Sequence, residues 1–287
     1  MKTIDPTEIS ARAFYKYMTA SVAPRPIAFV STIDDGGRVN LSPFSFFNMM
    51  GIDPPIIAFA PNRRSADGSQ KHTAINARQV PEVVVNMVTA EMVQQISLAS
   101  AEFARGVNEF AKAGFTELPS RVVAPPRVLE SPVQLECKVL EIIEKGSMEL
   151  ILAEVVLAHF SEDLLDDAGQ IDQKKTSWVA RLGGDWFAHT DHLFEVPRPQ
   201  MGIGVDALPE SIRNSKILTG NDLGRLGSVL LRPDPEKVIA YGQKAEIRQK
   251  IQEATLGCLY VPDVLHAYAH QLLEAGKTEE AWLVLLQ

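Results

Sequence analysis

A short basic segment between residues 63 and 73 combines the residue types that hold a phosphate group. It contains Arg63, Arg64 and Lys71, together with two serines, a threonine and a glycine. Arginine provides a forked cation and lysine a compact one, while hydroxyl groups and a glycine turn add further donors. No Walker or dinucleotide-binding fingerprint accompanies the segment, which favours a small phosphorylated cofactor held by β-structure. Taken alone, such a loop is also compatible with a solvated surface turn.

The composition is that of a globular protein with one large domain or two ordinary ones. Of 287 residues, 46% are hydrophobic and 22% charged, and the formal net charge is −8. This acidic balance argues against nucleic-acid partners and gives no reason to expect an anionic membrane surface. The chain shows no signal segment and no apolar run long enough to span a bilayer, so we expect a cytoplasmic protein. Cys137 and Cys258 indicate neither a disulfide framework nor a zinc site, and Cys137 is expected in the core.

Residues 22–160 show the alternation and the turn signals of a strand-rich region. The predicted strands are residues 27–33, 39–47, 56–60, 82–88, 133–143 and 148–160. The sequence Asp34-Asp35-Gly36-Gly37 predicts a tight hairpin between the first two strands, and Pro43 places the second strand at an edge or a bulge. Helices are expected at residues 73–78 and 91–103. Strands with glycine turns and only intermittent helices favour a barrel over a doubly wound sheet.

Beyond about residue 195 the pattern becomes helical, which predicts a division into residues 1–195 and 196–287. Helices are expected from the N-cap Asp234 to Ile251, over residues 262–273, and from Thr278 to the C-terminus. The last two are similar to one tetratricopeptide-like hairpin, whose single copy needs a neighbour to bury its apolar face. We therefore interpret them as a packing appendage or a dimer contact. Residues 202–207 fit GxGxxA but follow prolines rather than a strand, which indicates a flexible segment instead of a nucleotide fold.

Two groups of histidines have spacings that metal or catalytic sites use. His266 and His270 lie one helical turn apart, and His189 and His192 flank Asp191. Neither group is accompanied by the further ligands or the nucleophile motif that such sites require, so no metal site and no catalytic residue is predicted. The absence of a dedicated acid or base fits chemistry that is carried by a cofactor.

Three segments of the chain form a set by their order and spacing. They are PRPIAFVST at residues 24–32, NLSPFSFF at residues 40–47, and the run from Asp53-Pro54-Pro55 through SxxGxxKHTxxN at residues 65–76. In this order they resemble the flavin reductase-like family of FMN-binding split barrels, which includes flavoredoxin. The likeness covers about residues 10–190 and leaves the helical tail outside. The chain departs from the family pattern at His72, where many members carry aspartate, and at Trp186, where tyrosine is usual.

The resemblance implies a mainly β fold with helices, namely an FMN-binding split β-barrel over residues 1–195 with a C-terminal helical extension. In such proteins a strand like residues 40–47 runs beside the isoalloxazine ring, and a loop like residues 62–73 holds the ribityl chain and the phosphate. The implied cofactor-binding residues are Asn40, Ser42, Phe44, Ser45, Asn62, Arg64, Ser65, Lys71, His72 and Thr73. Phe44, Phe46 and Phe47 are expected to serve the core and a dimer interface more than to stack on the ring.

The activity that the resemblance implies is NAD(P)H-dependent flavin reduction. NADH or NADPH would enter the open cleft, stack on bound FMN and pass a hydride to N5. An alternative is a non-enzymatic, flavoredoxin-like electron carrier that holds FMN tightly and serves a redox protein partner. A third is a scaffold that has lost the cofactor. Family members form homodimers with the flavin sites near the interface, so a homodimer is expected here.

Overall fold

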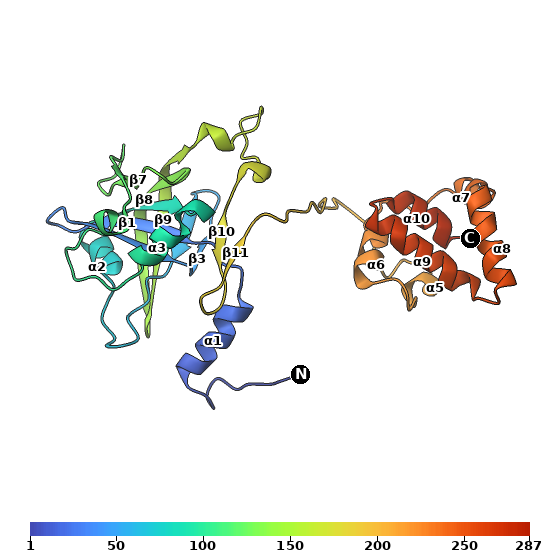
Figure 1. The fold of residues 1–287 in the computed structure, drawn as a ribbon, viewed down its shortest axis with the longest axis horizontal. Coiled ribbons are helices and arrows are strands. Elements are labelled where there is room, and N and C mark those ends of the chain that lie inside the picture. Colours follow the sequence, from blue (N-terminus) through green and yellow to red (C-terminus); the bar gives the residue numbers. More distant parts are fainter. The chain divides into compact units, whose positions relative to one another are not determined.

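The computed structural model describes residues 1–287, which divide into two compact units, Met1–Leu193 and Phe194–Gln287 (Figure 1). This division falls close to the sequence-based boundary after residue 195. Each unit has a hydrophobic core of its own. None of the helices is both long enough and apolar enough to cross a membrane.

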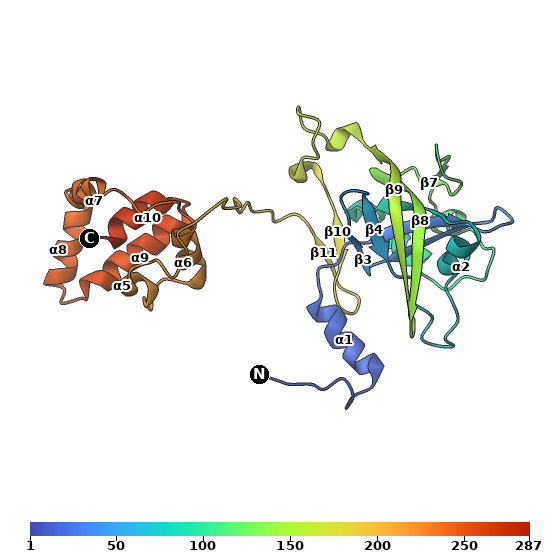
Figure 2. The ribbon, with the colours of Figure 1, turned by 180° about the vertical axis from the view of Figure 1, so that it is seen from behind.

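The first unit is built on one antiparallel sheet with the strand order β2-β1-β5-β8-β9-β4-β3. Its strands are β1 (Ala28–Ile33), β2 (Val39–Phe44), β3 (Phe47–Met49), β4 (Ile56–Phe59), β5 (Glu82–Met87), β8 (Val133–Lys145) and β9 (Met148–Phe160). Its two longest strands, β8 and β9, form one hairpin (Figure 2). Strands β2 and β3 follow each other in the chain yet form opposite edges of the sheet, so the sheet must curl for the chain to join them. The result is a barrel that stays open between these two strands.

The structure confirms most predicted strands and corrects one. The strand expected over residues 39–47 is divided into β2 and β3 at Ser45 and Phe46, where the chain passes from one edge of the sheet to the other. Pro43 lies in an edge strand as predicted, since it has no N–H to give to a further strand. The hairpin after β1 is confirmed, and the Asp34 carboxylate accepts hydrogen bonds from two backbone N–H groups of its turn, at 3.0 and 2.9 Å.

Four helices accompany the sheet. They are α1 (Ala11–Ser21), α2 (His72–Gln79), α3 (Val93–Ala99) and α4 (Glu109–Ala113), with 3₁₀ turns at Ala90–Met92, Glu162–Leu164 and Gln173–Lys175. Helix α2 confirms the helix expected at residues 73–78. Helix α3 ends before the predicted residue 103, because Ser100 turns back and its hydroxyl donates to the carbonyl of Ser97 at 2.6 Å. Helices α1 and α4 were not predicted, although Ser10 and Asn108 cap them with their side chains.

Alternate residues of the central strands face two different cores. In β1, Ala28 and Val30 point into the barrel interior, whereas Phe29 points to an outer layer that also contains Ile96 of α3. Cys137 is buried in the barrel interior as predicted, and burial raises the pKa of its thiol to about 12. Helices α3 and α4 therefore pack on the outer face of the sheet near β2.

Two short hairpins complete the first unit. Strand β6 (Glu117–Leu118) pairs with β7 (Arg127–Val128), and β10 (Val179–Arg181) pairs with β11 (Phe187–His189) across a turn that contains Gly183 and Gly184. The buried Arg25 fastens this region to α1, because its guanidinium donates to the carbonyl of Thr19 at 2.6 Å and to that of Leu182 at 2.8 Å.

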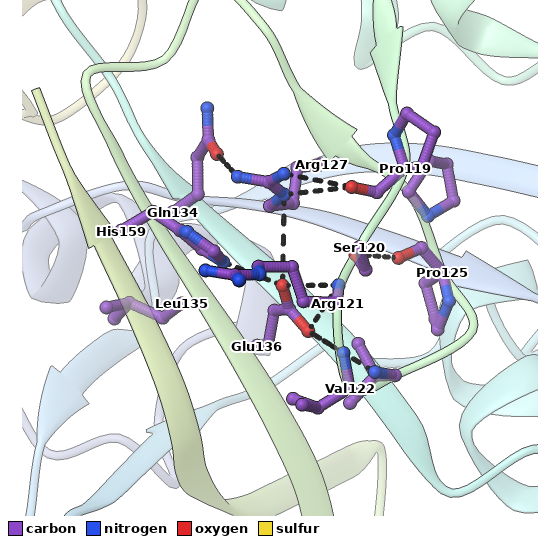
Figure 3. A network of polar contacts seen from close by, with 12 residues as sticks. Pro119, Ser120, Arg121, Val122, Pro125, Arg127, Gln134, Leu135, Glu136 and His159 are labelled. Carbon is purple, nitrogen blue, oxygen red and sulfur yellow. Dashed lines mark hydrogen bonds and ion pairs between the residues drawn. The ribbon is translucent and has the colours of Figure 1, made fainter.

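A buried carboxylate holds the loop between β6 and β7 against the sheet. Glu136 of β8 is fully buried, and its oxygens accept hydrogen bonds from the backbone N–H groups of Arg121, Val122 and Val123 at 2.7–3.2 Å (Figure 3). The Nε2 of His159 lies 2.7 Å from the same carboxylate. Burial works to raise the pKa of Glu136, but these donors outweigh it and hold that pKa below its usual range. The loop is thus anchored by a charged group inside the protein.

The second unit is a bundle of helices around one large aromatic side chain. Its helices are α5 (Glu210–Arg213), α6 (Gly220–Gly227), α7 (Pro235–Gly242), α8 (Ala245–Leu256), α9 (Val261–Glu274) and α10 (Thr278–Leu285). Trp282 is fully buried, and its Nε1 donates to the carbonyl of Leu226 at 3.1 Å. The single helix predicted from Asp234 to Ile251 is wrong, because the extended backbone of Lys244 separates α7 from α8. The two helices predicted last are confirmed as α9 and α10.

Candidate functional site

One pocket of the first unit gathers six of the ten residues that the sequence predicted to bind a cofactor. Strand β2, the loop after β4, the start of α2 and the segment after α3 all contribute to it. The lining residues are Asn40, Ser42, Arg64, Lys71, His72, Thr73, Ala99, Ser100, Ala101, Glu102, Phe103 and Glu109. The fold therefore brings the basic loop and strand β2 to one place.

The ammonium group of Lys71 faces this pocket without a partner that neutralises it. It makes no hydrogen bond and has no carboxylate within 4.0 Å, and it lies 5.7 Å from the centroid of the Phe44 ring. Burial, followed by the neighbouring cation of Arg64, lowers the pKa of Lys71, while Glu102 acts in the opposite direction. A bound anion would favour the charged form of this lysine.

Helix α2 begins at the pocket with free backbone donors. Lys71 is its N-cap and supplies no side-chain acceptor, and the N–H groups of His72 and Thr73 donate to no acceptor in the protein. Unpaired N–H groups at a helix start carry a partial positive charge that attracts anions. These donors and the Lys71 ammonium meet in the same pocket, which makes it suitable for a phosphate.

The guanidinium of Arg64 is held in place by its own loop. Its Nη1 donates to the Oγ of Ser69 at 3.2 Å and to the carbonyl of Gln70. Its Nη2 lies 3.5 Å from the Nε2 of His72, and because arginine can only donate, that imidazole nitrogen is the acceptor. Burial, followed by the cations of Arg64 and Arg105, lowers the pKa of His72. The imidazole is therefore neutral near pH 7 and has only Nδ1 left as a donor to a ligand.

Buried polar side chains join the pocket to the barrel. The Nδ2 of Asn40 donates to the Oγ1 of Thr73 at 3.0 Å, and the Nδ2 of Asn76 donates to the Oγ1 of Thr32 at 3.2 Å. All four side chains are buried. These bonds tie β1 and β2 to α2, so Asn40 and Thr73 have a structural role as well as a place in the pocket.

The other four predicted residues lie outside the pocket lining. Phe44 is buried in the barrel interior against Phe59, as expected for a core residue, while Ser45 lies between β2 and β3 and Ser65 is exposed. Asn62 differs from these, because its Oδ1 is buried and has no hydrogen-bond partner. An orphaned acceptor on the loop that also carries Arg64 suits a ligand that combines hydroxyl donors with a phosphate, as a ribityl phosphate does. The residues present therefore fit FMN.

Sequence reasoning missed two acidic residues of the pocket. Glu109 is almost fully buried, its Oε2 accepts a hydrogen bond from the N–H of Leu41 at 3.0 Å, and burial raises its pKa. Glu102 lies with its Oε1 3.7 Å from the Nε of Arg64. Nothing in the spacing of residues 107–110 shows that Glu109 meets β2. Only the fold reveals this contact.

The two histidines at helical spacing that were singled out in the sequence each have a polar partner within the second unit. The Nδ1 of His266 lies 2.8 Å from the Oγ of Ser215, and the Nδ1 of His270 lies 2.8 Å from a carboxylate oxygen of Asp222. Each imidazole thus has its own partner. The segment 202–207, which we expected to be flexible, is hydrogen-bonded to residues 227–229 of the second unit.

Comparison with known proteins gives the family. Residues 20–175 match the model of the flavin reductase like domain, and the chain belongs to this family. An uncharacterized protein of Deinococcus radiodurans is 38% identical over 201 residues, which are 68% of this chain and 88% of that protein. The split barrel with accompanying helices is thus the architecture of the first unit.

Two solved structures are similar over nearly their whole length. Nitrilotriacetate monooxygenase component B from Bacillus cereus is 30% identical with a TM-score of 0.65, covering 68% of this chain and 98% of that one. The 2-nitrobenzoate 2-nitroreductase NbaA of Pseudomonas fluorescens is 28% identical with a TM-score of 0.63, covering 73% and 99%. The class of activity is that of a flavin-related oxidoreductase.

Proposed function

We propose that the first unit binds FMN and catalyses the reduction of flavin by NADH or NADPH. The observation that carries the proposal is the meeting of Lys71, Arg64 and the free N–H groups at the start of α2 in one pocket. Lys71, which has no carboxylate partner, is suited to a dianionic phosphate, and Arg64 adds a forked donor. The family membership supplies the flavin, and the phosphate site favours FMN over a flavin without phosphate.

The residues of the chain bind and orient reactants in this proposal, and none is assigned as a general acid or base. Bound FMN would supply the chemistry, since its ring accepts a hydride from a nicotinamide. Lys71 and Arg64 would hold the phosphate, with Ser65 of the loop and Thr73 of α2 as further donors. The orphaned Oδ1 of Asn62 would accept from the ribityl chain. The strand containing Ser42, and Ser45 beyond it, would lie along the ring.

We further propose a homodimer, in which exposed apolar residues at the end of β3 and just after it are covered. Met49, Met50 and Ile52 are all more than 60% exposed, beside the open edge of the barrel. Exposed apolar residues that adjoin in this way are typical of an interface. Size-exclusion chromatography with light scattering would detect the dimer. We also keep the cytoplasm as the predicted location, and a redox protein as a possible further partner.

The first experiment is the visible absorption spectrum of the freshly purified protein, followed by analysis of the flavin that heat releases. We expect FMN, bound as purified or taken up from solution. Oxidation of NADH and of NADPH is then followed at 340 nm with added FMN. A protein that binds no FMN refutes the proposed site.

A flavoredoxin-like carrier is the competing outcome of the same measurement. It would keep FMN through dialysis and oxidise neither nucleotide, and a reductase would oxidise at least one of them. The absence of a dedicated acid or base fits both activities, since the flavin carries the electrons in each. Turnover with either nucleotide therefore decides between them.

A further inference from the structure

The tip of the β8–β9 hairpin contacts both ends of the basic loop, which comprises residues 63–73. At the start of the loop, the backbone N–H of Arg63 donates to the carbonyl of Ser147 at 3.0 Å. At its end, the Nε2 of Gln70 donates to the Oε1 of Glu149. The loop between β4 and α2 is therefore fastened at two points to a part of the sheet that lies far away in the sequence.

Glu149 is the residue on which these contacts converge. Its side chain is fully buried, and the same Oε1 lies 3.1 Å from the Nη2 of Arg78 and 3.6 Å from the Nη2 of Arg63. Donors from both ends of the loop and from α2 thus share one carboxylate oxygen. A buried carboxylate needs compensating positive charge, which the two arginines provide. Its Oε2 is buried and has no hydrogen-bond partner, so the carboxylate contacts the loop and α2 through Oε1 alone.

From Gln70 the connection continues into the pocket. The side chain of Gln70 is held by Glu149, and its backbone carbonyl accepts a hydrogen bond from the Nη1 of Arg64. Arg64 lines the pocket, with its Nη2 3.5 Å from the Nε2 of His72. One residue therefore joins the buried carboxylate to the guanidinium that faces the ligand.

We propose that Glu149 is a positioning residue that acts through Gln70 to orient Arg64 toward the phosphate of the ligand. The inference rests on the proposed function, because it requires a phosphorylated flavin in this pocket. Glu149 itself touches no ligand. Its effect is confined to the phosphate end, so it contributes to the preference for FMN over riboflavin, which has the same ring and ribityl chain without the phosphate.

The test compares the dissociation constants of FMN and riboflavin, measured by flavin fluorescence, for the wild-type chain and its variants. Glu149→Gln and Gln70→Ala should each weaken FMN binding about tenfold, as expected for the loss of one charge-assisted hydrogen bond, and change riboflavin binding less than about twofold. The double variant should be no weaker than the stronger single variant, because both changes interrupt the same connection.

Glu144 provides a matched control. Its Oε2 lies 3.2 Å from the Nη2 of Arg63 and its Oε1 contacts Arg78, so it pairs with the same two arginines as Glu149, but it makes no contact with Gln70. Glu144→Gln should leave the ratio of the FMN and riboflavin affinities unchanged. A loss in this control equal to that in Glu149→Gln would overturn the proposal, since the arginine pairs alone would then explain it.

Further outcomes separate this role from a general structural one. Equal weakening of FMN and riboflavin by Glu149→Gln, or no weakening in a folded variant, overturns the positioning role while the phosphate site stands. If Glu149→Gln does not fold, Gln70→Ala decides, because it leaves the buried carboxylate and both arginines in place. A wild-type chain that binds FMN and riboflavin equally well refutes the phosphate site, and the role of Glu149 with it.

Discussion

The carboxylate of Glu109 accepts a hydrogen bond from the backbone N–H of Leu41 at the outer edge of β2, at 3.0 Å. Strands β1 and β2 pair with Phe29 opposite Pro43 and Ser31 opposite Leu41. Backbone N–H groups two residues apart in a strand point to the same side. Pro43 has no N–H to donate, and the N–H of Leu41, two residues earlier, points away from β1 toward the open edge. Glu109 thus satisfies an edge donor on the strand that lines the pocket.

This contact predicts opposite effects for two substitutions of Glu109. Glu109→Ala leaves the Leu41 N–H without its acceptor and should lower the free energy of unfolding by about 1–3 kcal/mol. Glu109→Gln keeps an acceptor and removes the charge. Because burial raises the pKa of Glu109, the wild-type chain loses stability as pH rises through that pKa. Urea unfolding should therefore show that Glu109→Gln is at least as stable as the wild-type chain at pH 8. The difference in unfolding free energy between the two should shrink below pH 4.5, the ordinary pKa of a glutamate.

Removal of the cation at Lys71 is expected to weaken FMN binding specifically. Lys71→Ala eliminates a pocket-facing ammonium that has no carboxylate partner, and a charge-assisted bond to phosphate is worth about 1.5–3 kcal/mol. Isothermal titration should show a loss of about tenfold to a hundredfold in FMN affinity. Lys112→Ala, at an exposed position of α4, is the control and should bind FMN like the wild-type chain. Unchanged affinity in Lys71→Ala would refute the assignment.

His72 should make FMN binding depend on pH. Its pKa lies below the usual 6.5, chiefly because it is buried, and a bound phosphate would raise that pKa by stabilising the imidazolium. Binding then takes up a proton, so the affinity gains as pH falls from the pKa of His72 in the complex toward its lower pKa in the free protein. FMN itself gains a proton near pH 6, and for this reason the measured quantity is the affinity ratio of wild type to His72→Gln. We expect this ratio to rise about twofold to fivefold between pH 7.5 and pH 5. A constant ratio would place His72 away from the phosphate.

In the proposed site, the carboxylate of Glu102 would compete with the phosphate of the ligand for Arg64. Its Oε1 lies 3.7 Å from the guanidinium Nε, and the side chain is largely exposed. Exposed pairs of this kind contribute about 0.2–1 kcal/mol, so Glu102→Gln should strengthen FMN binding up to about fivefold at low salt. Asp185→Asn is the matched control, because Asp185 is an exposed partner of Arg181 at a similar 3.8 Å. Weaker binding in Glu102→Gln would show that this acid supports the site instead.

Sequence reasoning recovered the parts of the fold that short-range patterns encode. The hairpin at Asp34–Gly37, the helix after the basic loop and the long β8–β9 hairpin are visible in turn residues and alternation. The separation of β2 from β3 was not visible, because residues 39–47 alternate without interruption and only the closure of the sheet requires a break at Ser45. The break at Lys244 follows Gly242, the last residue of α7, and the prediction of one helix from Asp234 to Ile251 gave too little weight to this glycine.

The sequence predicted the basic residues of the candidate site. It did not predict the acidic residues that contact segments far away in the chain. Arg64, Lys71 and His72 follow one strand and are close in sequence, so their meeting was expected. Glu109 contacts a strand that lies 68 residues earlier, and Glu149 contacts a loop residue 79 positions away. A lone glutamate carries no signal of such a contact in a single sequence, since exposed glutamates are far more common.

Glu136 should make the first unit sensitive to acid. It is fully buried, which works to raise its pKa, but the N–H groups of Arg121 and Val122 and the His159 ring outweigh burial and hold that pKa below its ordinary value. For a carboxyl with a lowered folded pKa, the stabilisation is present above the unfolded value and is lost as pH falls through the folded one. Glu136→Gln should lose about 2–4 kcal/mol of unfolding free energy at pH 7, because a neutral amide replaces a buried charged acceptor. The loss should shrink as pH falls below 4.5, the ordinary pKa of a glutamate.

Urea unfolding between pH 3.5 and 7 measures this loss of unfolding free energy. The control is Glu130→Gln, because the Glu130 carboxylate accepts from one exposed backbone N–H. Equal losses in the two variants, or a loss in Glu136→Gln that does not vary with pH, would show that the buried charge is not what anchors the loop.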